Sequence, residues 1–259
     1  MNDKQKFYFN FKDQVVMVTG SGGWLGAGIA KSFSQAGAKL VLHGLKRSKR
    51  IHELEESIRD SGGQTMFIAG DLTNSSVVET IFDQIYDCFG FIDILINNAG
   101  IYPMSQILDM KEQEWDDVIT INMKSVFLCT KFFAKKLRDK DMTGSIVNID
   151  SIESLDSTRA HSHYDAAKAG IVMFTKVAAL ELGKLGIRVN SVGPGLINSP
   201  NLATWPEGKK RWMDRVPMGR LCEREDIANA CMFLSSEAAN FISGAHLIVD
   251  GGMLTNERY

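Results

Sequence analysis

The stretch "TGSGGWLG" (residues 19–26) follows the apolar run "VVMV" (15–18) and precedes the helix-like segment "AGIAKSFSQAGA" (27–38). A glycine-rich turn between a strand and a helix is typical of a phosphate-binding turn, because its backbone N–H groups can approach an anion closely. The strict G-x-G-x-x-G spacing fails, since Leu25 stands where the third glycine belongs. Trp24 occupies the middle of the turn, so its role has to be explained.

Working outward from this turn, short apolar and β-branched runs alternate with helical patterns along the whole chain. Most of these runs are continuously apolar, which is expected of parallel strands covered on both faces. The alternation predicts an α/β fold in one domain over residues 1–259: a doubly wound parallel sheet of about seven strands with helices on both faces. The strands are expected at 15–19, 39–43, 65–69, 92–97, 145–150, 187–192 and 246–250, and one helix at 49–61.

Composition excludes several classes of protein. The 259 residues are 44% hydrophobic and 23% charged with a net charge of −2, so no bulk charge favours nucleic acid or an anionic membrane. No apolar run approaches the roughly 18 residues of a membrane span, and residues 1–14 lack the pattern of a secretory signal. Four cysteines without a C-x-x-C pair fall in segments with helical patterns, where free cysteine is mostly a core residue; a reducing, cytoplasmic location is expected. They are Cys88, Cys129, Cys222 and Cys231.

Two expected helices, 115–137 and 164–183, carry more apolar residues than a single buried stripe requires. A helix that is apolar on more than one side is buried on more than one side. The excess is explained either by a broad core contact or by a second subunit, and we favour the second subunit.

Four motifs together resemble the short-chain dehydrogenase/reductase family: "TG…LG" in the first turn, "NNAG" at 97–100, "YDAAK" at 164–168 and "VGPGLI" at 192–197. The resemblance extends from Val15 to the "VDGG" of 249–252. It implies a Rossmann fold, an NAD(P)-dependent oxidoreductase activity and, commonly, a homotetramer. The family pattern T-G-x-x-x-G-x-G places a glycine where this chain has Trp24.

The same resemblance implies the cofactor contacts. Asp71 matches the position that binds the adenine amino group, Asn97 the position beside the adenosine ribose, and Ile197 a backbone contact to the nicotinamide carboxamide. The full expected set is Gly20, Gly23, Trp24, Leu25, Lys46, Arg47, Asp71, Leu72, Asn98, Ala99, Gly100, Tyr164, Lys168, Pro194, Gly195, Ile197 and Ser199.

The end of the second expected strand favours NADP(H) over NAD(H). In the family an acid there binds the adenosine 2′-hydroxyl of NAD, whereas Gly44 stands at that place and no carboxylate lies between Lys39 and His52. Lys46, Arg47, Lys49 and Arg50 follow, and a 2′-phosphate needs cations. A solvated basic helix start is the alternative explanation, and Gly23 stands where many NADP-dependent members have a basic residue.

The expected catalytic residues are Asn122, Ser151, Tyr164 and Lys168. Tyr164 and Lys168 are four residues apart in a helical pattern, so they share one face, and an adjacent ammonium together with oxidised nicotinamide would lower the pKa of the phenol. Ser151 precedes Tyr164 by thirteen residues, the family spacing, and its hydroxyl can stabilise charge on a substrate oxygen. Asn122 matches the family residue whose backbone carbonyl holds a water connecting the lysine to solvent.

Substrate residues are expected in the loops that follow the strands. Candidates are Glu153, His161, His163 and Trp205, with residues 199–218 forming a short lid. His161 and His163, without a nearby carboxylate or cysteine cluster, make a weak metal-ligand set, so we expect no metal and place both beside Tyr164.

Several substrate classes stay open. A sugar or sugar acid is favoured, with a steroid or cyclic ketone and a 3-oxoacyl thioester as alternatives. A non-catalytic, redox-sensing dinucleotide-binding module is the alternative from another functional class.

Trp24 is compatible with a nucleotide turn if the backbone there is right-handed helical, where a Cβ is allowed. Its indole is expected either at the rim of the cleft near the nicotinamide or against the neighbouring loop.

Overall fold

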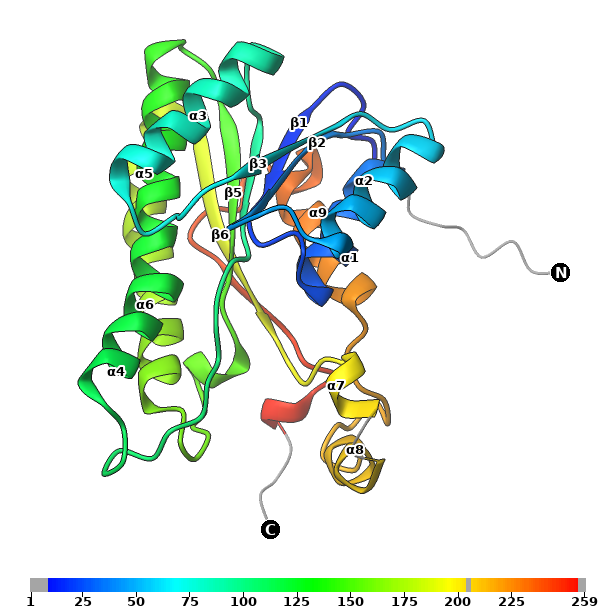
Figure 1. Ribbon diagram of the computed structural model, residues 1–259, viewed down its shortest axis with the longest axis vertical. Helices are drawn as coiled ribbons and strands as arrows, with labels where there is room; N and C mark the ends of the chain where they lie inside the picture. Colours follow the sequence, from blue (N-terminus) through cyan, green and yellow to red (C-terminus); the bar gives the residue numbers. More distant parts are fainter. Residues whose placement is uncertain (1–8, 204–205, 256–259) are drawn as a thin grey trace, which may run out of the picture.

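In the computed structural model, which describes residues 9–203 and 206–255, seven strands form one parallel sheet (Figure 1). The strand order is β3-β2-β1-β4-β5-β6-β7, so the direction of winding reverses between β1 and β4. The glycine-rich turn follows β1 and therefore lies at this reversal, where open α/β sheets bind their ligands. The strands are β1 (Val15–Val18), β2 (Lys39–Gly44), β3 (Thr65–Ala69), β4 (Ile94–Asn97), β5 (Gly144–Ile149), β6 (Ile187–Pro194) and β7 (His246–Val249).

Helices cover both faces of the sheet, because successive residues of each strand enter different cores. Val16 and Val18 pack with α1, α2 and α9, whereas Val15 and Met17 pack with α3 and α5 on the opposite face (Figure 1). The helices in the described residues are α1 (Trp24–Gln35), α2 (Lys49–Asp60), α3 (Ser75–Phe89), α4 (Glu112–Ile119), α5 (Ser125–Asp139), α6 (Ser162–Leu182), α7 (Pro200–Ala203), α8 (Pro206–Met213) and α9 (Arg224–Ser235). The predicted doubly wound fold is confirmed.

The predicted strand boundaries and the helix at 49–61 agree with the structure to within two residues. The helix predicted at 115–137 does not exist as one helix: α4 and α5 are separated by a π-helical turn at Thr120–Lys124. There the Ser125 N–H donates to the carbonyl oxygen of Thr120, five residues earlier. One extra residue in a turn rotates the helix face by about 100°. This rotation contributes to the broad apolar pattern of residues 115–137, which exceeds one stripe.

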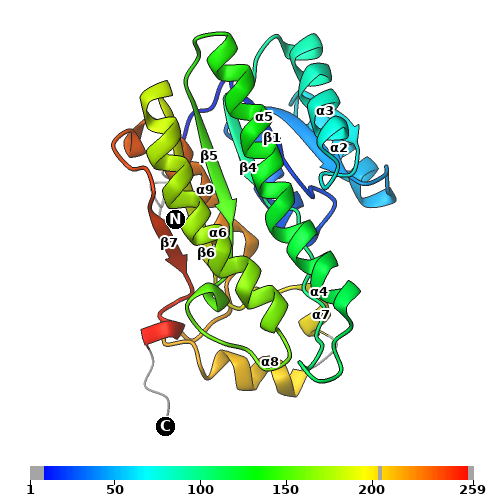
Figure 2. The ribbon, with the colours of Figure 1, turned by 90° about the vertical axis from the view of Figure 1, so that its left-hand side faces the viewer.

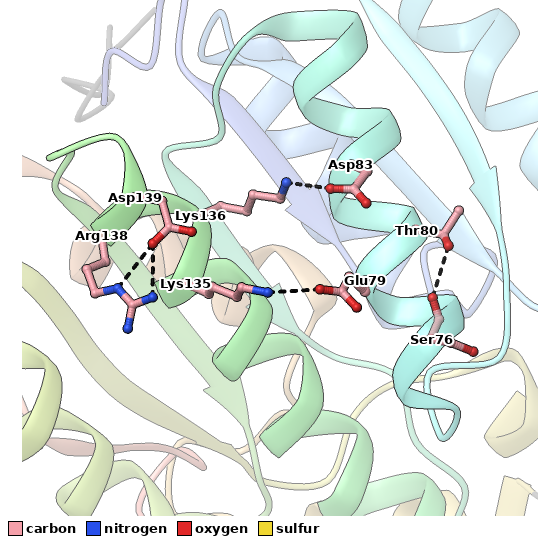
Figure 3. Close-up of polar contacts among 8 residues, drawn as sticks. All are labelled: Ser76, Glu79, Thr80, Asp83, Lys135, Lys136, Arg138 and Asp139. Carbon is pink, nitrogen blue, oxygen red and sulfur yellow. Dashed lines mark hydrogen bonds and ion pairs between the residues drawn. The ribbon is translucent and has the colours of Figure 1, made fainter.

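The helices α3 and α5 lie side by side and are joined by two exposed ion pairs. Figure 3 shows Lys135 paired with Glu79 at 2.9 Å and Lys136 paired with Asp83. Exposed pairs of this kind contribute only about 0–1 kcal/mol each. Their alignment therefore supplements the apolar packing of α3 and α5, which carries most of the stabilisation.

The cysteines only partly follow the expectation. All four are unpaired, and Cys129 and Cys231 are buried within α5 and α9. Cys88 is exposed on α3, and Cys222 is buried in a loop, where it pairs as a β-bridge with Ile197. The expectation of four helical core cysteines was wrong for these two residues. Cys88 is helical but exposed, and Cys222 is buried but lies in a β-bridge, which its apolar neighbours in sequence do not distinguish from a helix.

The carboxyl ends of the strands point toward α7 and α8, which lie beyond that edge of the sheet (Figure 2). Within residues 9–203 and 206–255, no helix combines the length and the apolar character needed to cross a bilayer.

Candidate active site

The glycine-rich turn forms a tight backbone loop between β1 and α1. Gly20 adopts φ +66°, and its N–H donates to Nδ1 of His43 at 3.3 Å, while the Ser21 N–H donates to the His43 carbonyl oxygen at 2.9 Å. The Nε2–H of His43 then faces the carbonyl oxygen of Gly70 at 3.0 Å. His43, which sequence reasoning missed, is a buried support beneath the turn, and burial lowers its pKa.

The turn is also fastened to the segment that follows β4. Oγ1 of Thr19 accepts hydrogen bonds from the N–H groups of Asn98 and Ala99, both at 2.9 Å. The Asn98 side chain donates to the Thr19 carbonyl oxygen at 2.9 Å. A Cβ on Gly26 would lie 2.5 Å from the Gly20 carbonyl oxygen, so the first turn of α1 can approach only as glycine.

The start of α1 is free to hold an anion. Its N-cap is Gly23, which offers no side-chain cap, and the first turn contains no acidic residue. The unpaired N–H groups of a helix start attract negative charge, as does the helix dipole. This arrangement fits the diphosphate of a dinucleotide.

A cleft of about 510 Å³ joins this turn to the start of α2. Ser48 caps α2 by accepting a hydrogen bond from the Ile51 N–H, and no acidic residue lies in the first turn of that helix. The lining residues are Gly20, Gly22, Gly23, Gly44, Leu45, Lys46, Ser48, Lys49, Arg50 and Ile51. Lys46, Lys49 and Arg50, three of the four basic residues named for the 2′-phosphate, therefore line the cleft, together with Ser48, which was not predicted.

Arg47 does not line this cleft. Its guanidinium pairs with the buried carboxylate of Glu55 and lies 4.7 Å from the centre of the Phe67 ring. Arg59 binds the other oxygen of Glu55 at 3.0 Å. Arg47 is therefore held against β3, because a buried carboxylate requires cationic partners.

The remaining adenosine-side residues differ in where their side chains lie. Asp71 is exposed, and hydrogen bonds from the backbone and side chain of Thr73 lower its pKa. Leu72 is in the core and offers only its backbone to a ligand. Asn97 is buried in β4 and donates to Oδ1 of Asn148 at 2.9 Å, so its side chain belongs to the interior of the sheet.

The four predicted catalytic residues come from three parts of the chain, with Tyr164 and Lys168 both on α6, and they approach one another at the carboxyl edge of the sheet. Lys168 of α6 donates from Nζ to the Ile149 carbonyl oxygen at 2.9 Å, and the same Nζ lies 5.4 Å from the Tyr164 ring centre. Ser151 follows β5 and is close enough to Tyr164 for its hydroxyl to lower the pKa of that phenol. A Cβ on Gly100 would lie 2.5 Å from Oδ1 of Asn122 and 3.8 Å from Nζ of Lys168, which places these groups around one small space.

Asn122 lies in the π-turn between α4 and α5. Its side-chain amide donates to the carbonyl oxygens of Val118 and Ile101, both at 2.9 Å. Its Oδ1 is buried without a hydrogen-bond partner among the described residues. π-Turns concentrate at functional sites, and here the turn ties the helix to the segment after β4.

Burial controls the ionisation of the pair on α6. It lowers the pKa of Lys168 to about 8, while the charge of Asp150 acts to raise it. The pKa of Tyr164 is raised, first by burial and then by Glu153, although the Ser151 hydrogen bond lowers it. In the protein without cofactor, desolvation and two carboxylates therefore keep the pKa of Tyr164 high, and its depression by the ammonium together with oxidised nicotinamide stays a prediction.

The predicted substrate residues divide into two groups. Glu153 is partly accessible and pairs with His161, which is 9% exposed: His161 Nδ1 lies 3.0 Å from Glu153 Oε2, and the centres of the His161 and Tyr164 rings lie 5.4 Å apart. His163 is fully buried and accepts the Tyr164 N–H at Nδ1, so its placement in the cleft was wrong. His161 and His163 differ because residues two apart at the start of a helix point to opposite sides. Trp205 lies outside the described residues.

Carboxylates surround His161, contrary to the expectation that none would be near. Glu153, His161 and Asp165 each have a ligand-type atom within 4.8 Å of the others. Burial raises the pKa of Asp165 to about 6, with the Thr158 N–H opposing and Glu153 adding to the rise. These three residues therefore form a polar cluster next to Tyr164. Two of its hydrogen bonds are already made, between His161 and Glu153 and from the Thr158 N–H to Asp165.

Trp24 packs on Arg224, the first residue of α9. The sequence predicts the rim of the cleft or the neighbouring loop, and not this helix. The Arg224 guanidinium lies 4.3 Å from the centre of the indole. The aliphatic part of Arg224 passes Gly28, where a Cβ would lie 2.5 Å from its Cδ. Trp24 is itself the first residue of α1, so its backbone is helical and tolerates a side chain.

The segment after β6 is fastened to the start of α9. Gly195 donates to the Val249 carbonyl oxygen at 2.9 Å, and Ile197 pairs with Cys222 as a β-bridge. The Asn198 side chain donates to Oε1 of Glu223 at 2.8 Å. Pro194 ends β6, and the Ser199 N–H donates to the Ile197 carbonyl oxygen at 2.8 Å. The predicted nicotinamide-side residues are thus held at the same edge as the catalytic group.

Comparisons with known proteins show the family to which this chain belongs. A family model described as enoyl-(acyl carrier protein) reductase matches residues 23–254. The 3beta-hydroxysteroid dehydrogenase 1 of Eggerthella lenta is 34% identical over 249 residues, covering 95% of each chain. The (2S)-[(R)-hydroxy(phenyl)methyl]succinyl-CoA dehydrogenase subunit BbsD of Thauera aromatica is 35% identical over 242 residues, covering 93% of this chain and 96% of its own.

Proteins of known structure share a comparable sequence identity with this chain and have the same fold. A proposed 2-deoxy-D-gluconate 3-dehydrogenase from Agrobacterium tumefaciens, with bound NADP, superposes with a TM-score of 0.88 at 35% identity, covering 97% of this chain and 100% of its own. A proposed gluconate dehydrogenase from the same organism has a TM-score of 0.90 at 30% identity, covering 96% and 99%. With the fold, the glycine turn and the tyrosine–lysine pair in place, the chain belongs to the short-chain dehydrogenase/reductase family of NAD(P)-dependent oxidoreductases.

Proposed function

We propose that this protein transfers a hydride between NADP(H) and a carbonyl or secondary alcohol substrate, with Tyr164 as the general acid/base. The observation that supports this most is the meeting of Tyr164, Lys168, Ser151 and Asn122 at the carboxyl edge of the sheet. When bound, NADP(H) supplies or accepts the hydride. The chain's own residues handle the proton and the charge on the substrate oxygen.

Each catalytic residue has a separate task in this proposal. Tyr164 gives its phenolic proton to the substrate oxygen during reduction and takes it back during oxidation. Its raised pKa keeps the proton on the phenol of the free protein at neutral pH. The Ser151 hydroxyl stabilises the charge developing on the substrate oxygen, and Lys168, whose pKa is about 8, passes protons onward. Asn122 positions the connection to solvent.

The preference for NADP(H) is supported by the start of α2. The helix N-terminus, the Ser48 cap and the side chains of Lys46 and Arg50 all border the cleft, and Gly44 stands at the end of β2. Among the described residues neither Lys46 nor Arg50 forms an ion pair, so both charges remain available for a 2′-phosphate. A relative of known structure contains NADP.

The double substitution Lys46→Ala with Arg50→Ala is expected to raise the KM for NADPH at least about tenfold, because two charge-assisted contacts to phosphate are lost. The KM for NADH should change less than about twofold. Steady-state kinetics with both cofactors measures this. The control is Lys184→Ala, an exposed lysine beyond α6. Equal losses for the two cofactors would contradict a 2′-phosphate contact.

For the substrate we propose a sugar or sugar acid. The polar pair of Glu153 and His161 lies beside Tyr164 and suits hydroxyl groups, and relatives of known structure are proposed gluconate-type dehydrogenases. Residues 199–218 would act as a lid, with Ser199 and Trp205 at the site.

Two other substrate classes have an observation in their favour. The side chains of Tyr102 and Met104, in the segment after β4, are exposed, and the centre of the Tyr102 ring lies 6.5 Å from that of Tyr164, which suits a steroid or cyclic ketone. A hydroxysteroid dehydrogenase is among the relatives. Lys209, Lys210 and Arg211 of α8 supply positive charge that suits an acyl thioester, and an acyl-CoA dehydrogenase subunit is also a relative.

A substrate panel tests the proposed function directly. Sugar acids, cyclic ketones and acetoacetyl thioesters with NADPH, and the matching alcohols with NADP⁺, are followed at 340 nm. We expect the highest kcat/KM with sugar acids. Highest activity with another class would replace the substrate assignment, and no absorbance change with any class would overturn the enzymatic function.

We further propose a homotetramer in the cytoplasm. The helices α5 and α6 lie side by side on an outer face (Figure 2), where Phe127, Met173, Val177 and Leu180 are exposed between 45% and 81%. A second copy of this chain would bury these apolar side chains, and the three buried thiols suit a reducing compartment. Light scattering at micromolar concentration should give four times the chain mass of 28.7 kDa; a monomer mass would refute the assembly.

A further inference from the structure

A buried carboxylate lies directly behind the expected catalytic serine. Asp150 follows β5, and its side chain is fully buried. Its Oδ1 accepts the Ser151 N–H at 2.7 Å, the Ser154 hydroxyl at 3.2 Å and Nε2 of His246 at 2.9 Å. Three donors on one oxygen fix the peptide from which the Ser151 side chain projects.

The pair of Asp150 and His246 occupies a space that the sheet leaves open for it. His246 is the first residue of β7, and Gly193 lies on the neighbouring strand β6. A Cβ on Gly193 would lie 2.8 Å from Nε2 of His246 and 3.0 Å from Oδ1 of Asp150. The contact between β5 and β7 across β6 therefore requires glycine at this position, which indicates a built arrangement.

The second oxygen of Asp150 is left without a hydrogen-bond partner among the described residues. A buried carboxylate oxygen with no donor requires compensation from nearby positive charge. The Lys168 ammonium is a positive charge close to it in the chain's fold: Nζ bonds the carbonyl oxygen of Ile149, the residue next to Asp150, and the charge of Asp150 acts to raise the pKa of Lys168. Asp150 thus joins the serine side and the lysine side of the site.

We propose that Asp150, held by His246, is a positioning residue that fixes the Ser151 peptide and supplies the buried negative charge facing the Lys168 ammonium. This inference rests on the proposed function of Tyr164, Lys168 and Ser151. It assigns a task to two residues that the motif comparison did not include.

Titratable groups from two further elements interact with Asp150. His246 of β7 bonds its carboxylate, and the charge of Asp150 acts on Lys168 and Tyr164 of α6; Glu153, in the turn after Ser151, acts on the same Tyr164. Asp150 acts to raise the pKa values of both Lys168 and Tyr164. Removal of its charge therefore lowers both, and the two ionisations move in the same direction.

The decisive variant is Asp150→Asn, which keeps an acceptor for the Ser151 N–H and removes the charge. We expect the pH profile of kcat for alcohol oxidation to move at least about one pH unit toward acid, with the KM values changed less than about threefold. The matched control is Ser154→Ala, which removes one hydrogen bond to Asp150 and no charge; its profile should not move. An unmoved profile in Asp150→Asn would overturn the inference.

His246 is tested by its conservative replacement. His246→Ala should lower kcat, while His246→Gln, which can still donate to Asp150, should restore most of it. Equal kcat values in the two variants would contradict the positioning role. Circular dichroism spectra that match the parent protein show that each variant is folded.

A second readout needs no substrate. The folded pKa of Lys168 lies below its unfolded value, so the unfolding free energy rises with pH between about 8 and 10.5. In Asp150→Asn this rise should begin at lower pH, and in a Lys168→Met background the difference should vanish. If the melting curves of Asp150→Asn are not shifted, the inference is overturned. If the parent protein turns over none of the substrates, the proposed function alone is overturned.

Discussion

Replacement of Tyr164 by phenylalanine is expected to lower kcat by about 10²–10⁴-fold, the usual contribution of a positioned general acid/base. The substitution removes one oxygen and keeps the ring, which contacts Tyr102, His161 and the Lys168 ammonium. Because the phenolic oxygen is the only group removed, cofactor binding should stay within about threefold of the parent protein. Single-turnover and steady-state assays, with fluorescence titration of NADPH, measure both quantities.

The matched control for this substitution is Tyr102→Phe. Tyr102 lies next to Tyr164 and is 65% exposed. Loss of its hydroxyl therefore tests whether removing a neighbouring phenolic oxygen is enough to lower turnover. We expect Tyr102→Phe to retain turnover. A Tyr164→Phe protein with unchanged turnover would contradict the general acid/base role. If the parent protein has no turnover but alters a partner in response to NADPH, the redox-sensing alternative replaces the enzymatic one.

Replacement of Gly26 by alanine is expected to weaken NADPH binding by at least about tenfold, which corresponds to about 1.4 kcal/mol. The new Cβ would lie 2.5 Å from the Gly20 carbonyl oxygen and 2.7 Å from Nδ2 of Asn98. Neither group can move freely, because Gly20 is held by His43 and Asn98 by Thr19. The turn and the start of α1 must separate, and the free energy of unfolding should fall by about 1–3 kcal/mol.

Gly183→Ala serves as the control for the glycine change. Gly183 follows α6 with helical angles (φ −59°, ψ −37°), and a Cβ there meets nothing within 4 Å. Its melting temperature and NADPH affinity should match or slightly exceed those of the parent protein. If Gly26→Ala lowers the melting temperature without weakening NADPH binding, the glycine turn is not where the cofactor binds.

The sheet could be predicted because its determinants are local. Each buried parallel strand is a continuous apolar run, and Val15–Val18 is covered on both faces as expected. The tyrosine–lysine pair could be predicted for the same reason, since a spacing of four residues sets one helix face. The π-turn at Thr120–Lys124 could not, because one extra residue in a helix leaves no periodicity long enough to recognise.

The errors at the site come from contacts between distant residues. Arg47 was expected beside the cofactor, yet a buried acid eight residues later and an aromatic ring on β3 hold it. The indole of Trp24 rests on Arg224, two hundred residues along the chain. His161 and His163 are two residues apart and both are buried, but only the assembled fold decides that His161 pairs with Glu153 beside the Tyr164 ring and that His163 is 0% exposed. Such choices depend on the assembled fold and have no local pattern.

The bridge between Ile197 and Cys222 has a consequence for how substrate choice can change. With the Asn198–Cys222 and Cys222–Leu196 backbone hydrogen bonds, it brings the two ends of residues 198–221 together at the sheet edge. Because the ends are already joined, the cost in entropy of altering the intervening length is small. Under the proposed role of residues 199–218 as a substrate lid, this stretch can be exchanged between relatives as a unit, so that substrate range would change while Tyr164, Lys168 and Ser151 stay in place.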